Sequence, residues 1–169
     1  MTPKIYNVLF ICTGNSARSI MAEVILNHLG RDRFKAYSAG SHPRGEVHPL
    51  TLEVLAGQHC DVGGLRSKSW TEFAAPDAPS MDFIFTVCDR AAGEACPAWP
   101  GRPITAHWGF ADPAAVLGDR ARQRKAFANA HFQIAARIRL LLALPIDKIE
   151  RMSLQTQLRE FGQQRDELP

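Results

Sequence analysis

The chain has 169 residues, of which 46% are hydrophobic and 22% are charged, a composition typical of one globular domain that buries about 70% of its unfolded surface. These proportions exclude a collagen-like or largely disordered chain. The 20 basic and 17 acidic residues give a net charge of only +3, and the arginines are scattered, which excludes the basic face of a nucleic-acid-binding protein.

The first half of the chain predicts a strand, a tight loop and a helix, followed by a second strand and helix. Ile5 to Cys12 is apolar enough for a buried parallel strand, and Ser16 to Leu29 has apolar residues at helical spacing that end at Gly30. We expect the second strand at Lys35 to Gly40 and a short helix at Pro49 to Gln58.

The alternation continues through the second half of the chain. A Pro-rich surface loop at Ala74 to Ser80 precedes a strongly apolar third strand at Met81 to Cys88, and a fourth strand follows at Ile104 to Trp108. One long helical pattern then covers Asp119 to Leu144 and stops at Pro145.

Strands that alternate with helices predict an α/β fold in which helices cover both faces of a parallel sheet. We assign residues 1–144 to this domain and residues 145–169 to a C-terminal helical extension of the same domain. Five apolar residues of the extension can share one face of a further helix: Ile149, Met152, Leu154, Leu158 and Phe161.

The apolar runs and the cysteines indicate a cytoplasmic protein. Val8 to Cys12 is too short for a signal peptide, and Leu140 to Leu144 is far shorter than the roughly 20 residues that span a bilayer. In this reducing compartment we expect no permanent disulfides and no metal site among the four cysteines, which are Cys12, Cys60, Cys88 and Cys96. Membranes and nucleic acids are not expected partners.

The loop after the first strand contains the residues best suited to catalysis and anion binding. It reads Cys12-Thr13-Gly14-Asn15-Ser16-Ala17-Arg18-Ser19, a cysteine followed by five residues and an arginine. Because the loop joins a strand to the N-terminus of a helix, its backbone N–H groups and the positive end of the helix dipole converge. We therefore predict that an oxyanion binds to residues 12–18, through Thr13, Gly14, Asn15, Ser16, Ala17 and Arg18.

Each polar side chain of this loop has a predicted role. The pKa of Cys12 should fall from about 8.5 into the range of roughly 3.5 to 7.5, which makes Cys12 a nucleophilic thiolate. Arg18 can bind two oxygens of a tetrahedral oxyanion as a planar fork. Ser19 can donate its hydroxyl to the Cys12 sulfur, and Asn15 can brace the loop.

A second glycine-rich segment, Gly40 to Gly45, has the glycine spacing of a nucleotide-binding loop. Glu46 and Val47 stand where such a loop needs Lys and Ser or Thr. We therefore assign no ligand to this segment.

The Cys12 to Ser19 loop in its strand-loop-helix context, together with Asp112-Pro113, resembles the low-molecular-weight tyrosine phosphatase superfamily, and within it the arsenate reductases, over about residues 5 to 144. The resemblance implies a four-stranded parallel sheet in the order 2-1-3-4. It also makes Asp112, which alone reads as a common surface turn, the acid that protonates the leaving oxygen. The predicted strands independently place Cys12, Cys88 and Asp112 at the edge of the sheet where ligands bind.

Two activities in this superfamily use the same loop. A tyrosine phosphatase needs aromatic walls for a ring, and its members have tyrosines after Asp-Pro where this chain has Ala114 and Ala115. A small tetrahedral oxyanion such as arsenate fits better. Arsenate reduction takes two electrons, which two thiols supply when they form a disulfide. By position, the resemblance to thioredoxin-coupled reductases assigns a disulfide relay to Cys12, Cys88 and Cys96.

Several alternatives stay open. Cys88 and Cys96 are one residue further apart than in the best-known members, so the electron donor is either thioredoxin or glutathione with glutaredoxin. In some members, residues matching Asn15, Glu23 and Ser38 bind potassium together with an aspartate, but Ser69 stands at the aspartate position, and we expect no cofactor while leaving potassium open. The other functions considered are phosphate monoester hydrolysis and a non-catalytic redox or oxyanion sensor. Asp112 argues against the sensor, because a sensor does not need an acid for a leaving group.

Overall fold

The computed structural model describes residues 3–88, 91 and 99–163. Four parallel strands form one sheet in the order β2-β1-β3-β4, which confirms both the α/β class and the predicted strand order. The strands are β1 (Tyr6–Cys12), β2 (Phe34–Gly40), β3 (Phe83–Thr86) and β4 (Ile104–His107).

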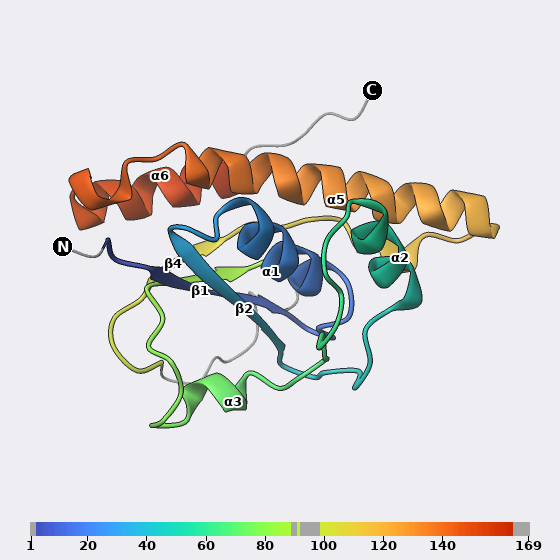
Figure 1. The fold of residues 1–169 in the computed structure, drawn as a ribbon, viewed down its shortest axis with the longest axis horizontal. Helices are drawn as coiled ribbons and strands as arrows, with labels where there is room; N and C mark the ends of the chain where they lie inside the picture. The colour runs from blue at the N-terminus through green and yellow to red at the C-terminus, as the bar shows by residue number, and fades with distance from the viewer. Residues whose placement is uncertain (1–2, 89–90, 92–98, 164–169) are drawn as a thin grey trace.

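Helices lie on both sides of this sheet. Helices α1 and α5 lie on one side and α3 on the other (Figure 1). In chain order the helices are α1 (Arg18–Leu29), α2 (Pro49–Gly57), α3 (Thr71–Ala74), α5 (Arg120–Leu142) and α6 (Arg151–Gln163), with 3-10 turns η1 (Pro113–Ala115) and η2 (Ile146–Lys148). Among the described residues, no helix has the length and apolarity that crossing a bilayer requires.

The core is built around β1, which is buried on both faces as expected for a central parallel strand. Its residues Val8, Leu9, Phe10 and Ile11 have no exposed surface. Aromatic rings from neighbouring strands continue the packing, with Phe10 stacked on Phe85 at 5.6 Å between ring centroids. This packing fixes the position of the loop that follows β1.

Two of the predicted elements differ from the structure next to the pocket. The third strand pairs only over Phe83–Thr86, so Cys88 lies two residues beyond the strand rather than at its end. The first helix begins at Arg18 instead of Ser16, because Asn15 has a left-handed backbone with φ 46° and the preceding loop residues curve around a pocket. The short helix α3 was not predicted.

The predicted tail helix is confirmed as α6, which packs against β4. The Trp108 indole nitrogen donates to the Leu158 carbonyl oxygen at 2.9 Å, and Arg159 Nε donates to the Thr105 carbonyl oxygen at 3.2 Å. A Cβ atom at Gly162 would lie 1.8 Å from the His107 carbonyl oxygen, so the close approach of helix and strand requires glycine there. The proposed boundary at residue 144 stays a prediction.

Candidate active site

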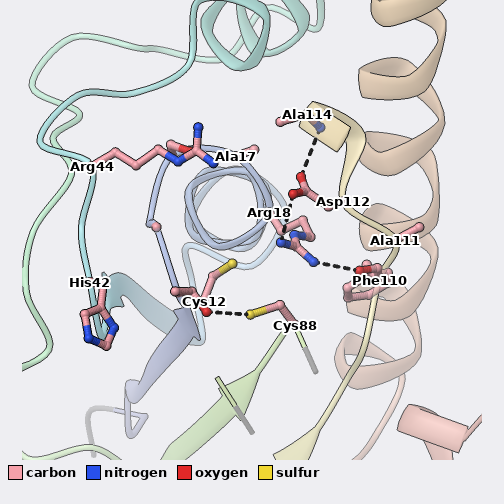
Figure 2. Close-up of a pocket in the computed structure, with 13 residues that line it drawn as sticks. Cys12, Ala17, Arg18, His42, Arg44, Cys88, Phe110, Ala111, Asp112 and Ala114 are labelled. Atoms are coloured by element: carbon pink, nitrogen blue, oxygen red, sulfur yellow. Dashed lines mark hydrogen bonds and ion pairs between the residues drawn. The ribbon is translucent and has the colours of Figure 1, made fainter. Parts of the chain in front are cut away.

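A pocket of about 620 Å³ opens at the C-terminal ends of β1 and β4. We call residues 12–18 the anion loop, and five of them besides Cys12 line the pocket: Thr13, Gly14, Ser16, Ala17 and Arg18. From other segments come His42, Arg44, Cys88, Phe110, Ala111, Asp112 and Ala114 (Figure 2). The structure thus brings the predicted Cys12, Arg18, Cys88 and Asp112 to one cavity.

Asn15 fixes the shape of the anion loop from behind. Its side chain has no exposed surface, and its Oδ1 accepts a hydrogen bond from the Lys68 backbone N–H at 3.0 Å. Its Nδ2 donates to Ser19 Oγ at 2.8 Å and to Ser38 Oγ at 3.0 Å. Local hydrogen bonding is what allows Asn to adopt the left-handed conformation. The predicted hydrogen bond from Ser19 to Cys12 stays a prediction.

The segment that follows β2 supports the anion loop along its length. The N–H groups of Ser41, His42 and Arg44 donate to the carbonyl oxygens of Cys12, Thr13 and Gly14 at 3.2, 2.9 and 2.9 Å. In a trans peptide the N–H points opposite to the C=O, so the loop N–H groups after those carbonyls are directed away from these hydrogen bonds.

Gly40, at the end of β2, makes this close approach possible. A Cβ atom there would lie 2.5 Å from the Thr13 carbonyl oxygen. The segment that the sequence analysis left without a ligand therefore contributes two pocket residues, Arg44 and His42. The only local signal for them was their position within four residues of the glycine that ends β2.

Arg18 connects the anion loop to the segment that carries the candidate acid. Its Nη1 donates to the Phe110 carbonyl oxygen at 3.0 Å, and its Nη2 lies 3.6 Å from Asp112 Oδ2. The other carboxylate oxygen of Asp112 accepts from the Ala114 N–H at 3.0 Å and caps η1 (Figure 2). Arg18 Nε is buried and has no hydrogen-bond partner within the described part of the chain. Since buried donors are rarely left unpaired, this atom fits an anion in the loop.

The two thiols of the pocket differ from the sequence expectation. Cys12 and Cys88 are both buried free thiols. A hydrogen bond with Cys88 and burial raise the pKa of Cys12, and these effects outweigh the lowering by Arg18. The predicted low pKa of Cys12 is therefore wrong for the protein with both thiols reduced, because the prediction considered only the loop and not the neighbouring thiol.

Cys88 has the complementary shift. The hydrogen bond from Cys12 lowers the pKa of Cys88 to about 5, with further contributions from Thr13 and Ala91 and against the effect of burial. Thr13 Oγ1 lies 3.5 Å from Cys88 Sγ, and the Ala91 N–H donates to the same sulfur at 3.4 Å. The opposite pKa shifts of the two thiols thus share one main cause, the contact between Cys12 and Cys88.

Cys60, the other cysteine among the described residues, does not line this pocket. Cys96 lies outside the described residues. Cys60 is half-buried and lines a separate cavity together with Glu23 and His28. Phe110 is the one Phe, Tyr or Trp among the described residues that line the active-site pocket.

Comparisons with known proteins agree with this geometry. The family model of low molecular weight phosphotyrosine protein phosphatases matches residues 7–152. An arsenate reductase of Shouchella clausii is 34% identical over 133 residues, which cover 78% of this chain and 91% of the relative.

Solved structures give the same relationship. The chain is similar to an arsenate reductase in the phosphate binding state, with a TM-score of 0.67 and 26% identity over 82% of this chain and 98% of the other. It is also similar to a thioredoxin-dependent arsenate reductase of Corynebacterium glutamicum, with a TM-score of 0.58 and 27% identity over 83% of this chain and 61% of the other.

Proposed function

Since the chain belongs to the low molecular weight phosphotyrosine protein phosphatase family, we propose that it reduces arsenate to arsenite in its anion loop. The observation that supports this activity over hydrolysis is the second buried thiol, Cys88, which lines the same pocket as Cys12. Hydrolysis of a phosphate ester needs one nucleophile, whereas a two-electron reduction needs two thiols. The names of the related arsenate reductases support the same assignment.

The first step forms a bond between sulfur and arsenic. Arsenate binds to the loop N–H groups and to Arg18, and Cys12 Sγ attacks the arsenic atom. The Cys12 proton moves along the shared hydrogen bond to Cys88. Asp112, in its protonated form, gives its proton to the departing hydroxyl, so that water leaves.

The second step moves the electrons. Cys88 loses its proton to solvent, and its thiolate attacks Cys12 Sγ. A disulfide forms between Cys12 and Cys88 while the sulfur–arsenic bond breaks. The electron pair of that bond stays on arsenic, which is reduced from the +5 to the +3 state, while the two thiols are oxidised. The arsenite product takes protons from solvent.

The last step restores Cys12. Cys96 attacks Cys88, releases the Cys12 thiol and leaves a disulfide between Cys88 and Cys96. Thioredoxin, or glutathione with glutaredoxin, then reduces that disulfide. We place the cycle in the cytoplasm, where such thiol reductants are maintained.

A second candidate is phosphate monoester hydrolysis, which is favoured by the pocket that Cys12, Arg18 and Asp112 line together. A nucleophile, an anion-binding loop and an acid are the groups that this reaction needs, and Cys12, Arg18 and Asp112 can supply them. The alanine at position 114 of the pocket favours a small oxyanion over an aryl ester. A non-catalytic sensor would have no use for an acid held beside the anion loop.

The experiment compares arsenite release with hydrolysis of an aryl phosphate in single-cysteine variants. We expect the wild-type protein to release arsenite repeatedly with a thiol donor, and Cys88→Ser to release none while it still binds phosphate. Cys96→Ser should release one arsenite per chain and stop with Cys12 bonded to Cys88, as peptide mass mapping would detect. Cys60→Ser is the matched control and should behave as wild type. Aryl phosphate hydrolysis without arsenite release would make the protein a phosphatase.

A further inference from the structure

A lysine ammonium is buried beside the residues that support the anion loop, and it does not line the pocket. The Lys68 side chain is only 9% exposed, and its Nζ donates to the Arg66 carbonyl oxygen at 3.0 Å. The same Nζ lies 3.6 Å from Glu23 Oε1 and 3.5 Å from Ser38 Oγ. Burial lowers the pKa of Lys68, and Glu23 opposes that shift. A buried charge of this kind requires a partner, which Glu23 supplies.

These groups form one network with the loop. Ser38 Oγ donates to Glu23 Oε1 at 2.5 Å and accepts from Asn15. The backbone of Lys68 takes part as well, since its N–H donates to Asn15 Oδ1 and its carbonyl oxygen accepts from Gly40 N–H at 2.9 Å. Lys68 therefore touches both the residue that shapes the loop and the acid beneath it.

The network needs a positive charge. The side chain of Glu23 is only 17% exposed. Glu23 lies on α1, behind a loop that attracts anions. Without a cation beside it, its carboxylate would repel an oxyanion in the loop and would lose its compensation for burial. The cation therefore supports anion binding without touching the anion.

Potassium, which the family resemblance left open, does not fit these residues. Asn15 Oδ1 is occupied by the Lys68 N–H, and Asn15 turns its Nδ2, a donor, toward Ser38. Ser69, at the aspartate position, instead accepts from the Thr71 N–H at 3.2 Å, at the start of α3. The remaining two oxygen atoms, Glu23 Oε1 and Ser38 Oγ, are already contacted by the Lys68 ammonium.

We propose that the Lys68 ammonium is a built-in cation that holds the anion loop in its binding conformation, in place of a free monovalent cation. Lys68 is thus a positioning residue, which acts through Asn15, Ser38 and Glu23. The inference rests on the oxyanion-binding part of the proposed function, and it is independent of the thiol relay.

The test measures binding of inorganic phosphate to the full chain by calorimetry, in tetramethylammonium and in potassium salts at equal ionic strength. We expect wild type to bind equally in both salts. Lys68→Ala should bind on the order of tenfold more weakly in tetramethylammonium and should recover in potassium, because the shortened side chain leaves space for the ion. Lys68→Met, which fills that space without charge, should be weak in both salts.

Lys125→Ala removes an exposed lysine from α5 and should match wild type throughout. The proposal is wrong if wild type binds phosphate more tightly in potassium, if Lys68→Ala keeps full affinity in tetramethylammonium, or if potassium restores nothing. If the variants fail to fold, tighter binding of phosphate by the wild-type protein in potassium would still contradict the proposal. A wild-type protein that binds phosphate in neither salt would instead contradict the anion loop itself.

Discussion

The two sides of the pocket are held in different ways. The anion loop is fixed from behind by Asn15, by the backbone after β2 and by Lys68, all independent of any ligand. On the other side, the segment of residues 110–114 is joined to the loop by Arg18. That arginine is also expected to bind the anion. Anion binding therefore depends mainly on the backbone of the loop. The acid Asp112, in contrast, is positioned by Arg18, which is also expected to bind the substrate.

Arg18→Lys should have the largest effect, because it removes the link between the two sides as well as the fork that binds the anion. One transition-state donor is worth about 100-fold to 1,000-fold, so losing two should reduce single-turnover arsenite formation by more than about 10,000-fold. A lysine keeps the charge but provides no planar fork. Near-normal turnover of this variant, measured by arsenite release, would show that charge alone suffices.

Asp112→Asn should affect only the second side of the pocket. The asparagine can still accept the Ala114 N–H and cap η1, so the fold is retained while the proton donor is lost. We expect the first chemical step to slow by roughly 100-fold to 10,000-fold, with phosphate still bound. Rapid-quench measurement of the sulfur–arsenic adduct tests this, and an unchanged rate would return Asp112 to a purely structural turn.

Gly40→Ala should disturb only the first side. Its new Cβ would press on the Thr13 carbonyl oxygen, and strain of this kind costs about 1–3 kcal/mol. We expect weaker phosphate binding and a lower free energy of unfolding, measured by calorimetry and urea titration. Gly57→Ala is the matched control, since a Cβ at Gly57 meets nothing within 4 Å. Equal results for the two variants would show that the close approach at Gly40 does not matter.

The smallest effect concerns how the two thiols share their proton. Since the hydrogen bond with Cys88 is the largest cause that raises the pKa of Cys12, Cys88→Ala should lower that pKa. At pH 7 a larger fraction of Cys12 is then thiolate, and its alkylation by iodoacetamide should be faster by up to about tenfold for each unit by which the pKa falls.

Alkylation rates of Cys12 from pH 4 to 10, resolved by peptide mass, give the midpoint in each variant. Cys60→Ala, which removes a thiol outside the pocket, should leave the midpoint where it is in wild type. A midpoint that does not move in Cys88→Ala would mean that Arg18 and the loop alone set the pKa of Cys12.

The sequence predicted the parts of the site that are contiguous in the chain. The loop from Cys12 to Ser19 and the alternating strands could be recognised because each is a local pattern, and the order of the strands follows from the family resemblance. Arg44, Lys68 and the shared proton of Cys88 were missed because they reach the loop only through tertiary packing. Residues matching a potassium site of some family members could be named from the sequence, but the proposed role of the Lys68 ammonium depends on how one side chain lies in three dimensions.

The contact between α6 and β4 has a consequence for the molecule in solution. Strand β4 is at one edge of the sheet, and an uncovered edge strand is a template for pairing with another chain and for aggregation. Arg159 uses its side chain to occupy the Thr105 carbonyl oxygen, and the narrow approach at Gly162 brings the helix against the end of the strand. The helix therefore protects this edge from self-association close to the segment that carries Asp112.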